Sequence, residues 1–279
     1  MIGVALALAA SLSWGLADFG GGMGTRRVQI VWVLVVSQLA GLLLVGTMAL
    51  ATQPHVPSGR ELAWGAFAGV TGAIGLGAFY RALAIGTMGI VGPVSATGAI
   101  VPVAYGLARG EHPSILQGVG IIVAIGGVVA AATEPLPEGT GRKLATGAGL
   151  SLLAALGFGS SLLGLNRVSQ AGVIWGTLTL RLTVIPIVLI AALLVRPSTA
   201  RLRPLLPILV ATGLFDTGAN LLYGASARHG LISVVSVLGS LYPIVLVVLG
   251  RFVLKERIAP VQLAGVGVAL AGVALISAG

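Results

Sequence analysis

The stretch Ala82–Gly127, which reads ALAIG…P…E…QGVGIIVAIGG, recurs in outline as Ser226–Gly272, which reads SARHG…P…KE…QLAGVGVALAG. Both copies are apolar over lengths that suit membrane-spanning helices. A tract of this kind that occurs once in each half of a chain is typical of a duplicated helical bundle. We therefore expect one membrane domain built from two similar halves.

Apolar segments of helical length follow one another along all 279 residues. Hydrophobic residues make up 57% of the chain, charged residues only 8%, and the mean hydropathy is +1.07. Because a transmembrane helix needs about 20 apolar residues, the sequence predicts an all-α integral membrane protein with ten transmembrane helices. Their approximate ranges are 2–22, 30–52, 62–84, 90–108, 114–133, 146–166, 173–195, 204–227, 230–250 and 259–278.

The predicted spans divide into two sets of five. The first repeat covers residues 1–133, the second covers 146–279, and a connecting loop at 134–145 joins them. Because five is an odd number, two tandem copies must enter the bilayer in opposite orientations and form inverted repeats. Secondary transporters commonly have this architecture and bind their solute near the bilayer midplane, between the repeats. We expect a solute site there.

The net charge of +9 does not gather on one face of the chain. Basic groups such as Arg26–Arg27 and Arg142–Lys143 sit at the edges of predicted spans, as the flanking residues of membrane helices do. This placement argues against nucleic-acid binding. Ten Lys and Arg residues fall in the odd-numbered loops and four in the even-numbered loops. By the positive-inside rule, this count places both termini outside the cell.

Four segments of the chain carry a family pattern. They are WGLADFGGG from Trp14, FYRALAIG from Phe79, ARGEHPSILQGVGIIVAIGG from Ala108, and the run from Asp216 to Leu275 with its SLYP…KER…Q order. Together they resemble the drug/metabolite transporter superfamily, and most closely its EamA-type permeases. The resemblance implies two five-helix repeats, a transporter rather than an enzyme, and a cavity lined by the first, third, fourth, sixth, eighth and ninth spans. It also implies cytoplasmic termini, opposite to the count of basic residues.

Charged side chains inside the predicted spans point to a functional site. On insertion scales a charge at the centre of a membrane helix costs about 3 kcal/mol, so such residues are rarely incidental. Asp18 follows Trp14 by four residues in the first span, which places both on one helix face. Asp216, Asn220 and Tyr223 form a polar stripe on the eighth span. Because either acid can bind a proton, Asp216 and Asp18 are the candidate proton-coupling residues.

Further polar residues complete the predicted substrate site. Tyr80 and Arg81 adjoin each other near the end of the third span. Ser236 and Ser240 lie one turn apart on the ninth span, just before Pro243. We predict that these side chains, together with those of the first and eighth spans, bind the substrate, and that an arginine engages a substrate carboxylate.

Each of these residues also has a purely structural interpretation. An Asp and an Arg within spans can pair and hold two helices together, and Arg81 or Arg181 can extend to the membrane interface. Serines in membrane helices often bond their own helix or a neighbouring one. Glu111 and Glu256 lie near span ends, where helix capping or ion pairing is the favoured interpretation. Both interpretations stay open at this stage.

Short strings that copy enzyme motifs lack the partners that the chemistry needs. Asp216-Thr217-Gly218 resembles the aspartic-protease triplet without a second copy, and Asp18-Phe19-Gly20 resembles a kinase triplet without the other kinase motifs. The three histidines are scattered and the chain has no cysteine. We therefore predict no catalytic residue, no cofactor and no metal site.

These observations predict a secondary transporter of small polar metabolites. The solute is expected to be an amino acid or a similar molecule, moved by alternating access in the export direction. The expected partners are the solute, the lipid bilayer and protons as the candidate coupling ion, with the protein a monomer or homodimer in the cell membrane of a prokaryote. The alternatives are a flippase for lipids or lipid-linked sugars and an uncoupled facilitator of the same fold.

Overall fold

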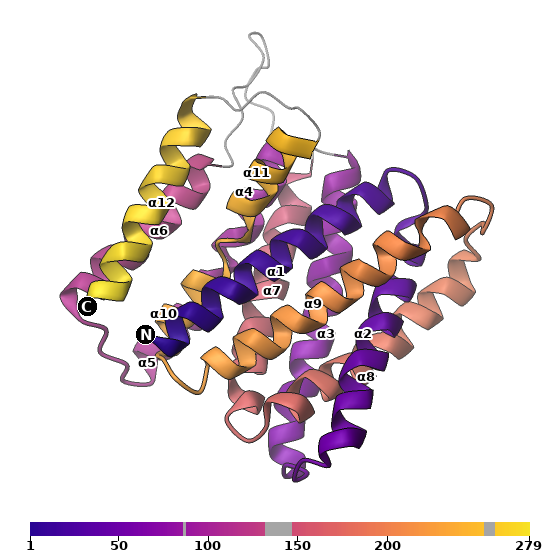
Figure 1. Ribbon diagram of the computed structural model, residues 1–279, viewed down its shortest axis with the longest axis horizontal. Helices are drawn as coiled ribbons and strands as arrows, with labels where there is room; N and C mark the ends of the chain where they lie inside the picture. Colours follow the sequence, from indigo (N-terminus) through magenta and orange to yellow (C-terminus); the bar gives the residue numbers. More distant parts are fainter. Residues whose placement is uncertain (86–87, 132–146, 254–259) are drawn as a thin grey trace.

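The computed structural model consists of helices and their connections over the residues that it describes, which are 1–85, 88–131, 147–253 and 260–279. The helices lie side by side in one bundle (Figure 1). In chain order they are α1 (Ile2–Thr25), α2 (Ile30–Thr52), α3 (Gly59–Ile85), α4 (Met88–Ala96), the 3-10 helix η1 (Thr97–Ala99), α5 (Ile100–Ala108), α6 (Ile115–Ala131), α7 (Ala148–Ser169), α8 (Val173–Val195), the 3-10 helix η2 (Arg203–Leu205), α9 (Leu206–Ser226), α10 (Ile232–Gly239), α11 (Tyr242–Val253) and α12 (Pro260–Ala278). The predicted connecting loop at 134–145 and the residue Glu256 lie outside the described residues.

Six helical segments are long and apolar enough to cross a membrane, with lengths between 21 and 27 residues. At 1.5 Å per residue, even the shortest spans about 30 Å, which is the thickness of a bilayer core. These segments belong to α1, α2, α3, α7, α8 and η2 with α9. The chain is therefore a multi-pass membrane protein. Four further apolar helices are only 10–17 residues long, so the count of ten spans stays a prediction.

The fourth and ninth predicted spans are each interrupted near the middle. In the fourth, η1 separates α4 from α5, and in the ninth a two-residue turn separates α10 from α11. Gly98 of η1 lies four residues before Pro102, and Gly239, the last residue of α10, lies four residues before Pro243. Because a proline ring clashes with the carbonyl four residues earlier and offers it no N–H group, an α-helix is broken or kinked there. The two prolines therefore favour both interruptions.

Long helices from the two halves of the sequence pack against each other. α3 packs along α7, α1 along α9, and α2 against both α8 and α9, while α6 and α12 form a pair at one side of the bundle (Figure 1). Glycine allows the closest approaches, since a Cβ on Gly157 of α7 would fall 2.6 Å from the Cα of Gly75 in α3. Close backbone packing of this kind drives helix association in lipid, where apolar burial provides little force.

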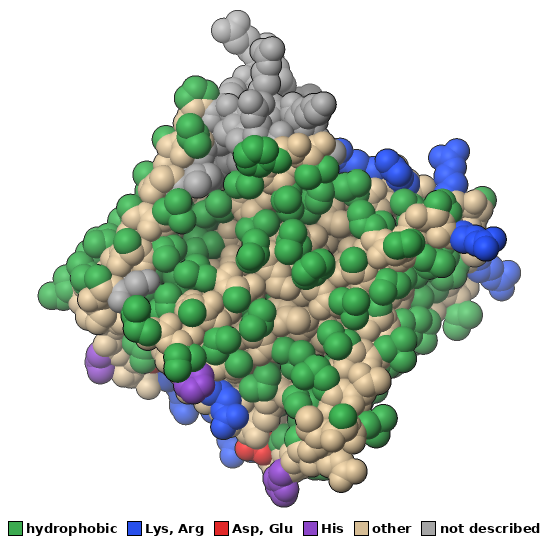
Figure 2. Space-filling model, viewed as in Figure 1, with side chains coloured by type: hydrophobic (Ala, Val, Ile, Leu, Met, Phe, Trp, Pro, Cys, Tyr) green, Lys and Arg blue, Asp and Glu red, His purple; other side chains and the backbone are tan. Residues whose placement is uncertain are grey.

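The outer surface of the bundle suits a lipid environment. Figure 2 shows hydrophobic side chains across the flank of the molecule and Lys and Arg side chains gathered at its edges. Leu50, Leu193 and Leu194 are between 74% and 80% exposed on this single chain. Because a soluble protein rarely leaves so many large apolar side chains in water, this surface is the one that faces the acyl chains.

Candidate functional site

A cavity of about 110 Å³ lies inside the bundle. At roughly 10–15 Å³ for each water-sized group, it has room for roughly ten such groups. Its wall includes residues of α1, α3, α7, α9, η1 and the α10–α11 region. It also includes residues of α2 and α8, which were not expected to line a cavity. Its walls are formed by Trp14, Asp18, Gln38, Gly72, Ala73, Leu76, Ser95, Gly98, Ala99, Phe158, Ser161, Leu162, Leu165, Leu180, Arg181, Val184, Asp216, Asn220, Gly239, Ser240 and Tyr242.

Both helix interruptions open onto this cavity. Gly98 of η1 and Gly239 at the end of α10 are among its lining residues. A Cβ on Gly239 would lie 3.3 Å from the Trp14 ring and 3.3 Å from the Tyr223 ring, so a side chain here would press on both. The absence of side chains at the two interruptions lets the neighbouring helices approach the cavity closely.

Arg181 is the most deeply buried charged residue of the site. It lies in α8, its side chain is 1% exposed, and its Nη2 donates a hydrogen bond to Asp216 Oδ2 on α9 at 2.6 Å. Its Nη1 donates to Gln38 Oε1 on α2. The guanidinium group therefore joins three helices. A buried cation needs such partners because the loss of hydration is costly in a low-dielectric interior.

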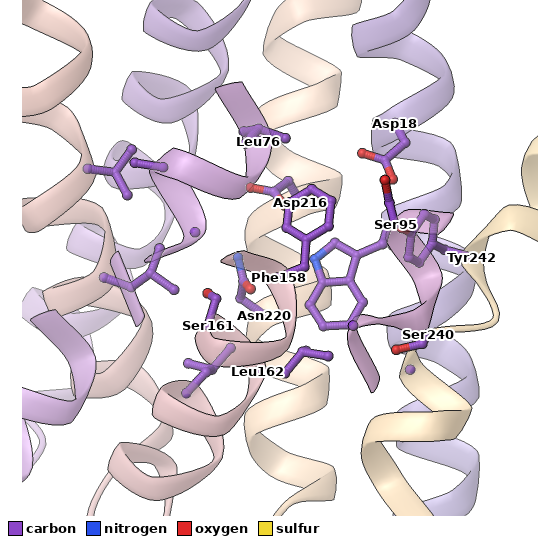
Figure 3. Close-up of a pocket in the computed structure, with 18 of the residues that line it drawn as sticks. Asp18, Leu76, Ser95, Phe158, Ser161, Leu162, Asp216, Asn220, Ser240 and Tyr242 are labelled. Carbon is purple, nitrogen blue, oxygen red and sulfur yellow. The ribbon is translucent and has the colours of Figure 1, made fainter. Parts of the chain in front are cut away.

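Asp216 and Asn220 present the polar face of α9 to the cavity. They lie one helical turn apart, and Figure 3 shows both side chains at the same side of the pocket. The Asp216 side chain is 23% exposed although it is paired with Arg181. The third member of the predicted stripe, Tyr223, does not line the cavity, and its hydroxyl group is 2.7 Å from Ser236 Oγ and donates to the Leu162 carbonyl at 3.3 Å.

Asp18 reaches the cavity from α1 without a partner of its own. It has no hydrogen bond or ion pair with any residue that the structure describes. Figure 3 shows Asp18, Ser95 and Tyr242 together on the side opposite Asp216. The hydroxyl groups of Ser95 and Tyr242 are both buried and have no hydrogen-bond partner among the described residues. This side of the cavity therefore holds polar groups that the protein itself leaves unsatisfied.

The remaining predicted residues are divided between the cavity wall and the surrounding packing. Trp14 lines the cavity, and its ring centroid lies 5.6 Å from that of Tyr223. Ser240 lines it as well, while its Oγ donates to the Ser236 carbonyl of its own helix at 2.8 Å. Ser236 is fully buried beside Tyr223. Ser240 thus bonds its own chain segment and Ser236 bonds a neighbouring helix, as the structural interpretation of these serines expected.

Tyr80 and Arg81 lie outside the wall of the cavity. Tyr80 is 2% exposed, and its hydroxyl group occupies the space that a Cβ on Gly21 of α1 would need. Arg81 is exposed. The cation that lies at the cavity is Arg181, which is too deeply buried to extend to the membrane interface.

Glu111 caps a helix of the other half of the chain. Its carboxylate accepts hydrogen bonds from the backbone N–H groups of Ile232 at 2.7 Å and Ser233 at 3.1 Å, and from the Ser233 hydroxyl at 2.8 Å. These N–H groups belong to the first turn of α10, where a helix has unsatisfied donors and favours a negative charge. The cap fixes the helix that carries Ser236 and ends at Gly239.

Several cavity residues were not in the predicted site. Gln38, Ser95, Phe158 and Tyr242 line the cavity from α2, α4, α7 and α11. A signal existed for Gln38, which is a polar amide inside the strongly apolar segment Ile30–Thr52. No set of three or more His, Cys, Asp or Glu side chains suited to a metal ion occurs within the described part of the chain.

Comparisons with known proteins identify the family. One solved structure, titled "Crystal structure of protein", is similar over 98% of this chain and 95% of its own length, with 16% sequence identity and a TM-score of 0.77, and this likeness shows the fold alone. No curated protein matches the sequence. The model of the EamA-like transporter family matches residues 1–133 and 145–278. The chain therefore belongs to the EamA-like transporter family of the drug/metabolite transporter superfamily and is a membrane transporter of that type.

Proposed function

We propose that this protein is a secondary permease that exports a small polar metabolite, an amino acid or a similar molecule, across the cell membrane of a prokaryote. The observation that carries the proposal is a cavity with two carboxylates, of which only Asp216 is paired among the described residues. A coupled transporter needs a solute site and a group that can change its charge within the membrane, and this cavity offers both.

The packing of the helices supports two corresponding halves, residues 1–133 and 146–279, joined at 134–145. In such a correspondence α1 matches α7, α2 matches α8, α3 matches α9 and α6 matches α12. If each helix is replaced by its counterpart, the contact of α3 with α7 becomes the contact of α9 with α1, which the structure also has. In the same way, the contact of α2 with α9 becomes the contact of α8 with α3. In the pairs α2–α8 and α6–α12, each helix packs against its own counterpart. Halves related in this way favour alternating access, in which one half rocks against the other around a fixed site.

The corresponding halves supply different chemistry to the cavity. Gln38 is the ninth residue of α2 and Arg181 is the ninth residue of α8, and both helices contain 23 residues. The two side chains bond to each other, so the matched positions meet at the centre of the molecule. We assign the coupling role to Asp216, whose charge holds Arg181, and the solute-binding role to Asp18 with Trp14.

The proposal is tested by solute flux into proteoliposomes, with and without a proton gradient. A labelled panel of amino acids, amines, nucleosides and sugar phosphates is offered to the intact protein and to the variant Asp216→Asn. Gradient-driven, saturable flux that falls in Asp216→Asn, and not in the control Glu61→Gln outside the cavity wall, is the expected result. Saturable flux that ignores the gradient would make the protein a facilitator. No flux of any solute by folded protein would overturn the proposal in favour of a lipid flippase.

A further inference from the structure

We infer that the cavity selects a solute with a net positive charge, a small primary amine with an apolar body, and that Asp18 binds its ammonium group. The inference rests on the proposed transport function and names the substrate class of the same site. It replaces the amino acid of that proposal with an amine that lacks a carboxylate, and it departs from the sequence-based expectation that an arginine engages a substrate carboxylate.

The charges that line the cavity do not balance. Its lining residues include three that carry a charge when ionised, Asp18, Asp216 and Arg181. Arg181 and Asp216 neutralise each other in their ion pair. When Asp18 is ionised as well, one negative charge is left uncompensated, in a space surrounded largely by apolar side chains. Because an unpaired charge away from water is costly, the ionised form of Asp18 needs a positive partner, which a monovalent cationic solute supplies.

A solute carboxylate would meet a cation that already has a carboxylate partner, because Arg181 is paired with Asp216. Both Nη atoms of Arg181 are engaged, one by Asp216 and the other by Gln38. A guanidinium group has five N–H donors, of which Asp216 takes one and Gln38 takes one, while Nε is buried without a described partner. A solute carboxylate would have to displace Asp216 from Arg181 and leave that side chain as an uncompensated charge. The geometry thus disfavours anions and zwitterions.

The surroundings of Asp18 match the hydrogen bonds of a primary ammonium group, which has three N–H donors. The Asp18 carboxylate and the hydroxyl oxygens of Ser95 and Tyr242 are three acceptors on the same side of the cavity (Figure 3). The two hydroxyl groups have no other partner among the described residues. The indole of Trp14, four residues before Asp18 on α1, adds an aromatic surface of the kind that attracts cations.

The rest of the wall suits a short hydrocarbon. Leu76, Phe158 and Leu162 line the cavity beyond the polar groups. The volume of about 110 Å³ limits the solute to a small molecule. A hard metal cation is a poor fit, because it requires about six oxygen ligands rather than one carboxylate and an apolar wall.

Three probes that share one carbon skeleton test the inference. They are 3-methylbutylamine, which has only the amine, leucine, which has both groups, and 4-methylpentanoate, which has only the carboxylate. Isothermal titration calorimetry on the purified full chain in detergent gives their affinities. We expect the amine to bind at least about tenfold more tightly than leucine, and the carboxylate not to bind. Leucine binding as tight as that of the amine would overturn the inference.

Variants separate recognition from folding. Asp18→Asn is expected to weaken binding of the amine at least about tenfold, and Ser95→Ala and Tyr242→Phe by smaller factors, with unchanged elution of the folded protein in size-exclusion chromatography. The matched controls are Ser151→Ala and Tyr105→Phe, which lie outside the cavity wall. If Ser95→Ala and Tyr242→Phe bound the amine with unchanged affinity, the assignment of the ammonium site to this side of the cavity would be overturned. This test holds even if Asp18→Asn fails to fold. If other solutes were transported but the amine did not bind, the inference would be refuted and the proposed transport function would stand. If no solute were transported, the proposed function itself would be refuted.

Discussion

Asp216 and Asp18 stand at opposite sides of one cavity (Figure 3), and they differ in what holds them. Asp216 on α9 accepts a hydrogen bond from Arg181 at 2.6 Å, and Arg181 in turn bonds Gln38 on α2. Asp18 on α1 has no such partner among the described residues. A carboxylate that is already neutralised ties helices together, whereas an unpaired one can attract a solute. The same residue type thus serves two purposes, according to whether a cation lies within reach.

This difference predicts opposite responses to substitution. Stability of the bundle should depend on the Asp216 side of the cavity, because three helices meet at Arg181. Solute affinity should depend on the Asp18 side, because nothing else there compensates the charge. Variants that alter one property without the other therefore test the comparison directly.

The largest effect on stability is expected from Arg181→Met. Removing the cation leaves Asp216 charged and unpaired at the cavity and leaves Gln38 without its donor. Breaking one partner of a buried pair typically costs about 3–5 kcal/mol in the free energy of unfolding. Thermal unfolding in detergent, followed by circular dichroism, measures the loss.

A double variant and a surface variant accompany this measurement. Arg181→Met with Asp216→Leu removes both charges, and we expect it to recover most of the stability, since apolar replacements of buried pairs are often neutral. Arg60→Met replaces an exposed arginine at the start of α3 and should change little. If the single and double variants unfolded at the same temperature, the ion pair would not be what stabilises this side of the cavity.

A moderate effect is expected from Asp216→Asn. The amide oxygen can still accept from Arg181, but the charge is lost, and hydrogen bonds to charged groups contribute about 1.5–3 kcal/mol. The protein should fold with a lower unfolding temperature, and gradient-driven flux should fall by about tenfold or more, because the group assigned to coupling can no longer change its charge. Flux with the kinetics of the unchanged protein would remove Asp216 from the coupling role.

Much of the membrane architecture could be predicted from the sequence because it depends on local composition. Long, predominantly apolar runs such as Ile30–Thr52 and Val173–Val195 specify spanning helices by their length and composition. The broken segments were predicted as continuous spans. Each break lies near the carbonyl four residues before Pro102 or Pro243, where the proline ring clashes, but Pro186 lies inside the continuous helix α8, so a proline alone does not decide where a helix breaks.

The arrangement of the site depends on contacts that no local pattern encodes. Trp14, Asp18, Asp216, Asn220 and Ser240 were predicted at the site and line the cavity. Of the two intramembrane arginines, Arg81 was predicted at the substrate site, but the packing of α8 on α2 places Arg181 beside Asp216, and Arg81 does not line the cavity. In the same way, helical spacing placed Tyr223 on the face of Asp216, but the approach of α10 draws its hydroxyl group to Ser236.

The smallest effect on stability is expected from Asp18→Asn. No partner among the described residues loses a bond and an uncompensated charge is removed from an apolar space, so the free energy of unfolding should not fall. Solute binding should nevertheless fall, because the cavity loses the charge that attracts a cation. Thermal unfolding and calorimetry on one preparation measure both quantities. A large loss of stability with intact binding would mean that Asp18 has a structural partner and that the two carboxylates do the same work.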